Sequence, residues 1–483
     1  MAELVQTLLS FPPDSKEPLT PKQYDTKINH YLKDLRKVQP AQWTKKYEKK
    51  ELIELLDPSV NSIPYMISLT ELIKANAKDK KRIDQLVFNA VGFLTTFDPI
   101  QVRYVGSEWR VLLDWTIDYL GKHPADDVSS ISTAILRLDP TAGTFTNNHL
   151  AFLELCLKLG VPSQAIPILD RDIYAYPQKH WKIVPEEPPS EEHELSNAFI
   201  TEKSGFAEKL DSSDVLQYYL LGAQVYIAVR NYSRARLFLE YILLAPSQQH
   251  ATSALQVEAY KRWLLLGLLA EGRQYPQPKT LDQTTLKNVK ACSRPYEAVT
   301  DAFSKRESQK LVAEIQTGQE VWMEDGNLRF VNEVVTALQR YRVIDLQKTY
   351  AALPVTRVAS LLQAQPGETF QQLQEMIGGG FLNASVSGSG TDAILRFHDT
   401  TSTAPTDIDL AAQTERIQNL VTFIRDADRR LQLTKEYVEH QKRQKHSAGA
   451  DGDLADVMDL TWDAPNASNN TIDDDGDEDI MAS

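Results

Sequence analysis

The stretch from Ile344 to His398 reads IDLQKTYAAL PVTRVASLLQ AQPGETFQQL QEMIGGGFLN ASVSGSGTDA ILRFH, and the order of its patterns decides the fold. Ile344–Leu353 and Val355–Leu362 have the length and composition of two short helices. Pro354 can open the second helix, because the first turn of a helix does not use the N–H group that proline lacks. We therefore expect two consecutive helices before the Pro-Gly break at 366–367.

A third helix and a hairpin follow in the same stretch. Phe370, Leu373 and Ile377 recur at the spacing of one apolar helix face, and the glycine triplet at 378–380 ends that helix. Phe381–Val386 and Ala393–His398 have the length of strands, and the Ser-Gly-rich loop between them predicts a hairpin. Three helices followed by such a wing define a winged helix. Its core is predicted to consist of Phe370, Leu373, Ile377, Phe381, Leu395 and Phe397.

The charge of this winged helix argues against nucleic acid as its ligand. Many winged helices insert their third helix into the major groove of DNA, and Lys and Arg side chains supply most of the affinity for phosphate. No Lys or Arg occurs between Val358 and Leu395. We therefore predict that the module binds protein, through its sheet edge and the face of its third helix. The side chains expected to make this contact are Gln371, Gln374, Phe381, Leu382, Ile394 and Arg396.

The residues before this stretch are predicted to form a solenoid of helices, with almost no alternating strand pattern before residue 381. We place N-terminal helical repeats at residues 1–292 and a further helical part at 293–343, ahead of the winged helix at 344–399. One segment resembles a tetratricopeptide unit, a pair of antiparallel helices that must stack on neighbouring pairs to bury its apolar faces. The residues in that pattern are Tyr218, Leu221, Gly222, Val225, Tyr226, Ala235, Leu239 and Pro246.

A long amphipathic helix is predicted after the wing, over residues 406–446. Its apolar side chains recur at steps of seven, and a sustained heptad seam needs another helix against it. Two arrangements satisfy this need: a helical bundle with other chains, or packing against the solenoid of the same chain. We expect the bundle contact, through Leu410, Ile417, Leu420, Ile424, Leu431 and Val438.

The last segment, residues 447–483, is predicted to be disordered. Between Gly449 and Ser483 it carries 11 Asp and Glu and no Lys or Arg, so most of the net charge of −14 belongs to it. A composition so acidic cannot bury enough apolar surface to pay for ordering. An apolar island at Leu454–Trp462 leaves two interpretations open, a short docking motif or a solvating tail.

The composition also indicates the cellular compartment of the protein and the kinds of partner that it can bind. Cys156 and Cys292 are the two cysteines, too few for a disulfide framework and typical of a reducing compartment. No apolar run approaches the roughly 20 residues of a membrane span, and residues 1–5 lack the basic start of a signal peptide. We expect a soluble intracellular protein that binds neither nucleic acid nor membrane.

The sequence contains no recognisable catalytic or metal-binding pattern. His193-Glu194 begins a zinc-helix motif, but Asn197 stands where the second histidine should be. There is no phosphate loop, no His-x-His pair, and the glycine triplet precedes a strand, which is the wrong context for a dinucleotide turn. We therefore predict that the protein is not an enzyme and binds no metal and no cofactor.

The sequence resembles the PCI family, in which helical repeats end in a winged helix and a long terminal helix. PCI proteins are scaffold subunits of the proteasome lid, the COP9 signalosome and a translation-initiation complex, and within the family this chain is most similar to a signalosome subunit. The likeness covers roughly residues 150–445. It is carried by Asp214 to Pro246, Glu258-Ala259-Tyr260-Lys261, Pro295-Tyr296, Leu346 to Leu353, Met376-Ile377 and Arg396-Phe397-His398-Asp399.

The resemblance implies a non-catalytic scaffold in the cytoplasm and nucleus. It implies that the complex removes the ubiquitin-like protein Nedd8 from cullins and that a different, zinc-bearing subunit performs the cleavage. It further implies that winged helices of the subunits pack side by side, here between subunits 1 and 8, and that terminal helices join one bundle. A scaffold of the proteasome lid or of an initiation complex is the alternative, because those relatives share the architecture.

Overall fold

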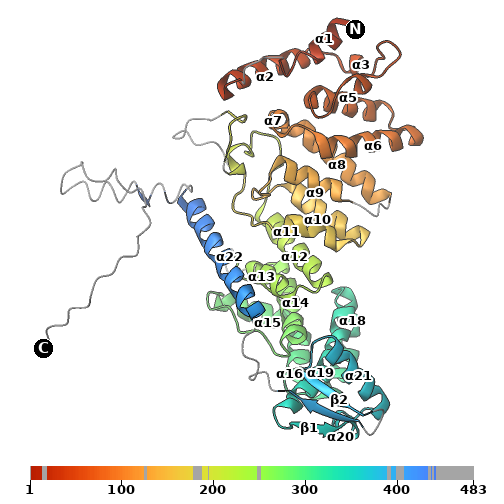
Figure 1. Cartoon of the computed structure of the whole chain (residues 1–483), viewed down its shortest axis with the longest axis vertical. Coiled ribbons are helices and arrows are strands. Elements are labelled where there is room, and N and C mark those ends of the chain that lie inside the picture. The colour runs from red at the N-terminus through yellow and green to blue at the C-terminus, as the bar shows by residue number, and fades with distance from the viewer. Residues whose placement is uncertain are drawn as a thin grey trace, which may run out of the picture. The chain divides into compact units, whose positions relative to one another are not determined.

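The computed structural model describes residues 2–13, 19–123, 128–177, 188–193, 195–246, 252–388, 393–398 and 407–432, together with residues 437, 440 and 441. The chain divides into two compact units, Met1–Thr400 and Thr401–Ser483, which are described separately. Within the described residues, none of the helices combines the length and the apolar composition needed to cross a bilayer. The fold is mostly helical, as the sequence predicts (Figure 1).

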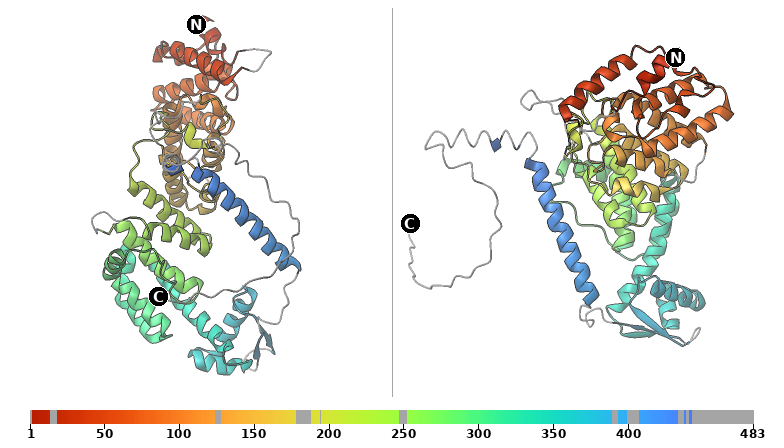
Figure 2. Two further views of the ribbon diagram at one scale, coloured as in Figure 1. Left: turned by 90° about the vertical axis from the view of Figure 1, so that its left-hand side faces the viewer. Right: turned by 45° about the horizontal axis from the view of Figure 1, so that its top comes forward.

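Before residue 348, the regular elements that the structure describes in the first unit are helices, and consecutive helices stack on one another (Figures 1 and 2). Short 3-10 turns occur at Pro162–Ala165 and Ser196–Ala198. The helices are α1 Ala2–Leu8, α2 Pro21–Leu35, α3 Pro40–Trp43, α4 Leu52–Leu55, α5 Ser62–Ala75, α6 Lys80–Thr96, α7 Pro99–Val102, α8 Gly106–Lys122, α9 Ser129–Leu138, α10 Asn147–Leu159, α11 Ile166–Leu169, α12 Ser212–Ala228, α13 Tyr232–Leu243, α14 Ala254–Ala270, α15 Gln283–Cys292, α16 Arg294–Ser304, α17 Ser308–Thr317, α18 Gln319–Glu324 and α19 Leu328–Gln347.

The tetratricopeptide-like pattern corresponds to the pair α12 and α13. Gly222 lies where the two helices approach closely, since an added Cβ would come within 2.7 Å of the Phe238 ring. Ala235, on the facing helix, is fully buried. Asn231 begins α13 by accepting a hydrogen bond from the Arg234 N–H at 3.3 Å, which satisfies a backbone donor of the first turn. The predicted helical pair is therefore confirmed, and small residues set its spacing.

The winged helix follows α19 as β1 Ala352–Pro354, α20 Val355–Leu362, α21 Pro366–Gly378, β2 Ala384–Ser387 and β3 Ile394–Phe397. The three strands form an antiparallel sheet in the order β1-β3-β2. The two helices α20 and α21 and the hairpin are confirmed. The first helix expected here, Ile344–Leu353, is wrong: residues 344–347 end α19, and the chain then pairs with β3 as a strand.

Two properties of the sequence explain that strand. Leu353 precedes Pro354, and the proline ring disfavours a helical backbone for the residue before it. Leu353 also pairs with Leu395 in the centre of the sheet, where both side chains are buried. One apolar residue in a three-residue strand produces no visible alternation, which is why the pattern missed it.

Among the described residues of the first unit, buried apolar side chains form two separate groups. The larger extends through the repeats from Leu8 to Leu338. The smaller begins at Val343 and lies within the winged helix. Because α19 contributes side chains to both, one continuous helix crosses the predicted division at residues 343–344.

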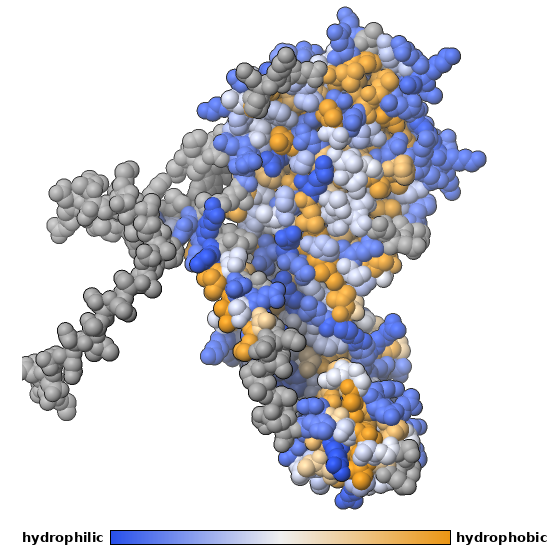
Figure 3. Space-filling view, in the orientation of Figure 1, coloured by the Kyte–Doolittle hydropathy of each residue, from blue (hydrophilic) through white to orange (hydrophobic). Residues whose placement is uncertain are grey.

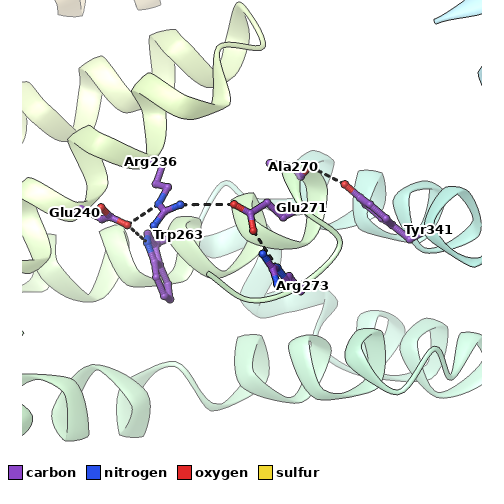
Figure 4. Close-up of polar contacts among 7 residues, drawn as sticks. All are labelled: Arg236, Glu240, Trp263, Ala270, Glu271, Arg273 and Tyr341. Carbon is purple, nitrogen blue, oxygen red and sulfur yellow. Dashed lines mark hydrogen bonds and ion pairs between the residues drawn. The ribbon is translucent and has the colours of Figure 1, made fainter. Parts of the chain in front are cut away.

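A polar network connects the last repeat helices to α19 (Figure 4). Arg236 of α13 forms ion pairs with Glu240 at 2.7 Å and, through a second nitrogen, with Glu271 at 3.6 Å at the end of α14. Trp263 of α14 donates its indole N–H to Glu240 at 3.3 Å. Tyr341 of α19 donates its hydroxyl to the backbone carbonyl of Ala270 at 2.7 Å. These contacts fix α19 against α14.

The second unit contains α22, Asp407–Gln432. The long helix expected over residues 406–446 is thus confirmed over the range that the structure describes as continuous. The acidic tail at 447–483 and its Leu454–Trp462 island lie outside the described residues.

Candidate protein-interaction surfaces

On the outer face of the winged-helix sheet, two side chains of the central strand are exposed. Ile394, which is 39% exposed, and Arg396 point outward from β3, whereas Leu395 between them is fully buried. Their neighbours across the strands are small. Arg396 lies between Ala352 and Ser385, and Ile394 between Pro354 and Ser387. The central strand therefore presents one apolar and one cationic side chain on this face, and the exposed His398 follows directly after the strand.

The strand β2 is an edge of this sheet. It pairs with β3 on one side, and no described strand pairs with its other side. The other edge, β1, contains Pro354, whose nitrogen cannot donate to a further strand. An unpaired edge without proline is a template for a strand from another chain. β2 is thus the better edge for β-augmentation.

The glycine triplet turns the chain from α21 into the sheet through a Schellman motif. Gly380 has a φ of +70°, the left-handed conformation that glycine adopts without strain. The Phe381 N–H then bonds the carbonyl of Met376 at 2.9 Å, and the Gly380 N–H bonds that of Ile377 at 3.1 Å. This turn directs Phe381 outward, where its ring is 58% exposed and the Arg340 guanidinium lies 4.8 Å from the ring centroid.

Two sequence assignments in this turn are exchanged in the structure. Phe381, predicted in the core as well as at the interface, is exposed and belongs only to the surface. Leu382, predicted at the interface, is 3% exposed and lies in the core, so it cannot offer a surface to a partner. The cause is the start of the strand: β2 begins at Ala384, after the Schellman turn, so the alternation counted from Phe381 was out of register.

The other five predicted core residues all belong to the core of the winged helix, but they are buried to different extents. Leu373 and Leu395 are fully buried, while Phe370, Ile377 and Phe397 are partly buried and pack against the same cluster. The members that the sequence pattern missed are mostly aliphatic side chains of α19, β1 and α20. The buried cluster consists of Val343, Leu353, Val355, Val358, Leu362, Leu373, Met376, Leu382, Ala384, Ala393 and Leu395.

The exposed face of α21 is polar and weakly acidic. Gln371 and Gln374 are both exposed, as predicted from their position in the helix. Gln371 donates to the Glu375 carboxylate at 3.3 Å, and Gln372 donates to Gln339 of α19 at 3.3 Å. The face offers amide donors and acceptors and two carboxylates, Glu368 and Glu375, which suits hydrogen bonding to protein rather than to phosphate.

Two arginines hold the winged helix against the helices before it. Arg342 of α19 donates to the backbone carbonyl of Leu361 at 2.6 Å and to the Ser308 hydroxyl at 2.8 Å. Arg306, after α16, pairs with Asp345 at 2.9 Å. The position of the sheet is therefore fixed relative to α16–α19 by charge-assisted hydrogen bonds as well as by α19 itself.

The helix α22 carries the predicted apolar seam in exposed positions. Leu410, Ile417, Leu420, Ile424 and Leu431 are each about half exposed or more, with Ile417 at 62%. A single helix cannot bury its own stripe. Val438, the last predicted seam residue, lies outside the described residues. The structure adds Phe423, 52% exposed beside Ile424, which a strict search at steps of seven passed over.

The described residues also bear on the chemistry of the chain. No group of three or more His, Cys, Asp and Glu side chains among them is arranged to hold a metal ion. His193, where the zinc-like motif begins, contacts the backbone carbonyl of Pro188 at 3.0 Å through Nε2. His398 contacts the Ser385 hydroxyl at 3.0 Å on the surface of the sheet.

Helical repeats that continue through one helix into a winged helix define a PCI-type protein. Comparison with known proteins identifies the subunit family to which the chain is similar. Residues 26–284 match the family model described as COP9 signalosome complex subunit 3, N-terminal helical repeats. COP9 signalosome complex subunit 3 of Emericella nidulans is 32% identical over 370 residues, 74% of each chain. The Neurospora crassa subunit 3 is 25% identical over 92% of this chain and 93% of its own length. The Drosophila melanogaster subunit 3 is 26% identical over 64% of this chain and 65% of its own length.

The chain therefore belongs to the COP9 signalosome subunit 3 family. The family model covers most of the repeats, including residues 26–140, which by sequence pattern matched only as generic helices. The similarity to the Neurospora crassa subunit extends over nearly the whole chain. The resemblance to a signalosome subunit is thus confirmed.

Proposed function

We propose that this chain is a non-catalytic scaffold subunit of the COP9 signalosome, the complex that removes Nedd8 from cullins and so regulates cullin–RING ubiquitin ligases. The observation that carries the proposal is the match of residues 26–284 to the subunit 3 family model. The resemblance assigns isopeptide cleavage to another, zinc-bearing subunit. The contribution of this chain is then to hold other subunits at fixed positions.

The winged helix joins neighbouring subunits in this proposal, with subunits 1 and 8 as the expected neighbours. The open edge of β2 supports an added strand, and the exposed Ile394 and Arg396 on the outer face support packing of a second module. The contacts of Arg306 and Arg342 support a fixed direction for both surfaces. No nucleic acid and no membrane are involved.

The helix α22 joins the bundle of terminal helices. Its exposed seam supports this role because about five apolar side chains at heptad spacing need a helical partner. The alternative partner is the solenoid of the same chain. The site of action is proposed to be the cytoplasm and the nucleus, where cullin–RING ligases work.

Purification from its own cells tests the identity of the complex. A tagged copy of the full chain, expressed at native level, should co-purify with the other COP9 signalosome subunits in equal amounts by quantitative mass spectrometry. Co-purification with proteasome lid subunits or initiation factors in place of these would establish the alternative PCI scaffold and overturn the proposal.

Reconstitution tests the scaffold role. The isolated chain should leave a Nedd8-modified cullin intact, and omission of the chain should weaken assembly of the remaining subunits.

Ile394→Asp, on the outer sheet face, should fold normally and weaken the complex, because a charge would be buried without a partner. The matched control is Ser360→Asp, an exposed position at the end of α20. Cleavage of the modified cullin by the isolated chain would contradict the proposal.

A further inference from the structure

Seven lysines form a basic edge on the first helical repeats. They come from two runs, one between α3 and α4 and one at the turn into α6, and all seven side chains are exposed. Glu51 brings the runs together, because its carboxylate pairs with Arg82 of α6 and lies 3.9 Å from Lys46 Nζ. Figure 3 shows a dense hydrophilic margin on the right of this region, which α6 reaches in Figure 1. The basic edge consists of Lys45, Lys46, Lys49, Lys50, Lys78, Lys80 and Lys81.

The helix geometry gives no reason for cations at the start of α6. Lys80, Lys81 and Arg82 occupy its first turn, which contains no acidic residue. The positive end of the helix dipole lies there, so cations in this turn are unfavourable for the helix. Asp79 caps the helix by accepting from the Arg82 N–H, but it does not require lysines after it. Residues that oppose local stability point to a role outside folding.

Three aromatic side chains adjoin the basic edge, of which Phe88 is exposed and Trp115 and Tyr119 are partly buried. Phe88 of α6, 78% exposed, is the most exposed large apolar side chain among the described residues. It lies two turns after Lys81 on the same helix face. One turn further, Gly92 leaves open space, since an added Cβ would meet nothing within 4 Å. On the neighbouring α8, Trp115 packs against Tyr119 with ring centroids 5.9 Å apart, and Tyr119 bonds Asp84 of α6.

We propose that this surface binds an acidic segment of a partner protein that also carries apolar side chains. The lysines complement carboxylates, and the exposed ring of Phe88 offers an apolar contact to a hydrophobic side chain of the segment. Glu48 and Asp79 interrupt the lysine runs. Separate cations divided by carboxylates suit discrete acidic side chains better than the continuous charge of a nucleic-acid backbone. The inference is independent of the scaffold role proposed above.

Fluorescence anisotropy with the full chain tests this surface. The probe is a short labelled peptide of alternating Glu or Asp and Leu or Phe residues, and a second peptide replaces Leu and Phe by Ser. Lys49→Glu with Lys50→Glu and Lys81→Glu should raise the Kd of the first peptide at least about tenfold. The matched control, Lys287→Glu with Lys305→Glu and Lys310→Glu, reverses three exposed lysines elsewhere and should leave it unchanged.

Apolar and folding readouts separate a binding surface from a structural one. Phe88→Ser should weaken binding of the first peptide several-fold and binding of the serine peptide little. Met323→Ser, at another exposed apolar position, should change the Kd of neither peptide. The melting temperature of the Lys81→Glu variant should not fall, because Glu suits the first turn of a helix better than Lys. The proposal would be overturned if the two triple lysine variants lost peptide affinity equally. It would also be overturned if the chain bound a DNA duplex more tightly than the acidic peptide.

Discussion

The helical repeats and the winged helix differ in where most of their aromatic side chains lie, although Phe88 of the repeats is exposed. The repeats bury them: Trp109, Trp263 and Trp322 are all at most 1% exposed within one continuous cluster. Among the described residues, the buried side chains of the winged-helix cluster are aliphatic apart from Met376, while Phe370 and Phe397 are partly buried and Phe381 is exposed. The difference indicates that buried aromatic rings stabilise the repeats, whereas the winged helix relies on a small aliphatic core and leaves Phe381 on its surface.

The largest effect on stability is expected in the repeats. Trp263→Ala removes a buried indole and its hydrogen bond to Glu240, and truncation of a buried Trp costs about 3–5 kcal/mol. We expect a large drop in the melting temperature of the first unit, measured by circular dichroism. The control, Trp263→Phe, keeps most of the buried ring and should lose less. A melting curve like that of the wild type for Trp263→Ala would contradict the packing described for α14.

A core truncation in the winged helix should have a more local effect. Leu395→Ala removes a fully buried side chain at the centre of the sheet, at a cost of about 2–5 kcal/mol. Because this cluster is separate from that of the repeats, limited proteolysis should reveal early cleavage within residues 353–397 while the helical signal of the repeats persists. Simultaneous loss of both would show that the two clusters unfold as one.

Acid should destabilise the repeats through His149. Its imidazole is buried on α10, where Nδ1 accepts the Thr146 N–H at 3.2 Å and Nε2 lies 3.3 Å from the Ala142 carbonyl. Burial lowers the pKa of His149, so the folded state favours the neutral form. The contribution of neutral His149 to the free energy of unfolding is therefore complete above the pKa of the unfolded chain, about 6.5. It is lost progressively as pH falls below that value, because protonation then favours the unfolded state.

Denaturant midpoints between about pH 7.5 and 5.5 measure this effect. His149→Gln, which cannot become charged, should lower stability at neutral pH but show a flatter decline toward acid. The control is His30→Gln on α2, whose side chain is 80% exposed. An identical decline in wild type and His149→Gln would mean that other groups govern the acid response.

The smallest effect on folding is expected at the winged-helix surface. Phe381→Ala removes an exposed ring and its contact with Arg340, so the loss in stability should stay below about 1 kcal/mol. The chemical unfolding midpoint should therefore hardly change, in contrast to that of Leu395→Ala. A cost as large as that of a buried phenylalanine would place the ring in the core, as its position in the sequence pattern first indicated.

Long-period patterns made most of the fold predictable from sequence. Helices such as α10, which ends at Gly160 with a φ of +72°, carry their own stop signals. The short strand β1 could not be found, because its pairing with β3 is a tertiary contact without a local signature. The exchange of Phe381 and Leu382 has the same origin: a Schellman turn shifted the start of the strand, and a shift in register reverses which side chains face the core.

The candidate surfaces were predictable to a different degree. The seam of α22 follows from heptad spacing, which depends on sequence alone. The basic edge does not, since its two lysine runs are separated by some thirty residues and meet only through Glu51 and Arg82 in the folded repeats. The acidic net charge of the whole chain, −14, conceals this local excess of cations.

Reconstitution with the sister subunits tests the central claim, that the chain assembles through exposed surfaces separable from its fold. Ile417→Asp with Ile424→Asp places two charges in the α22 seam, where each buried isoleucine contributes roughly 1.5–3 kcal/mol to a bundle. Gln418→Asp with Thr422→Asp adds the same charge on the polar side of the helix. In size-exclusion chromatography, we predict that the isoleucine variant folds but elutes apart from the complex, while the control elutes with it. Incorporation of the isoleucine variant at wild-type yield would contradict the account.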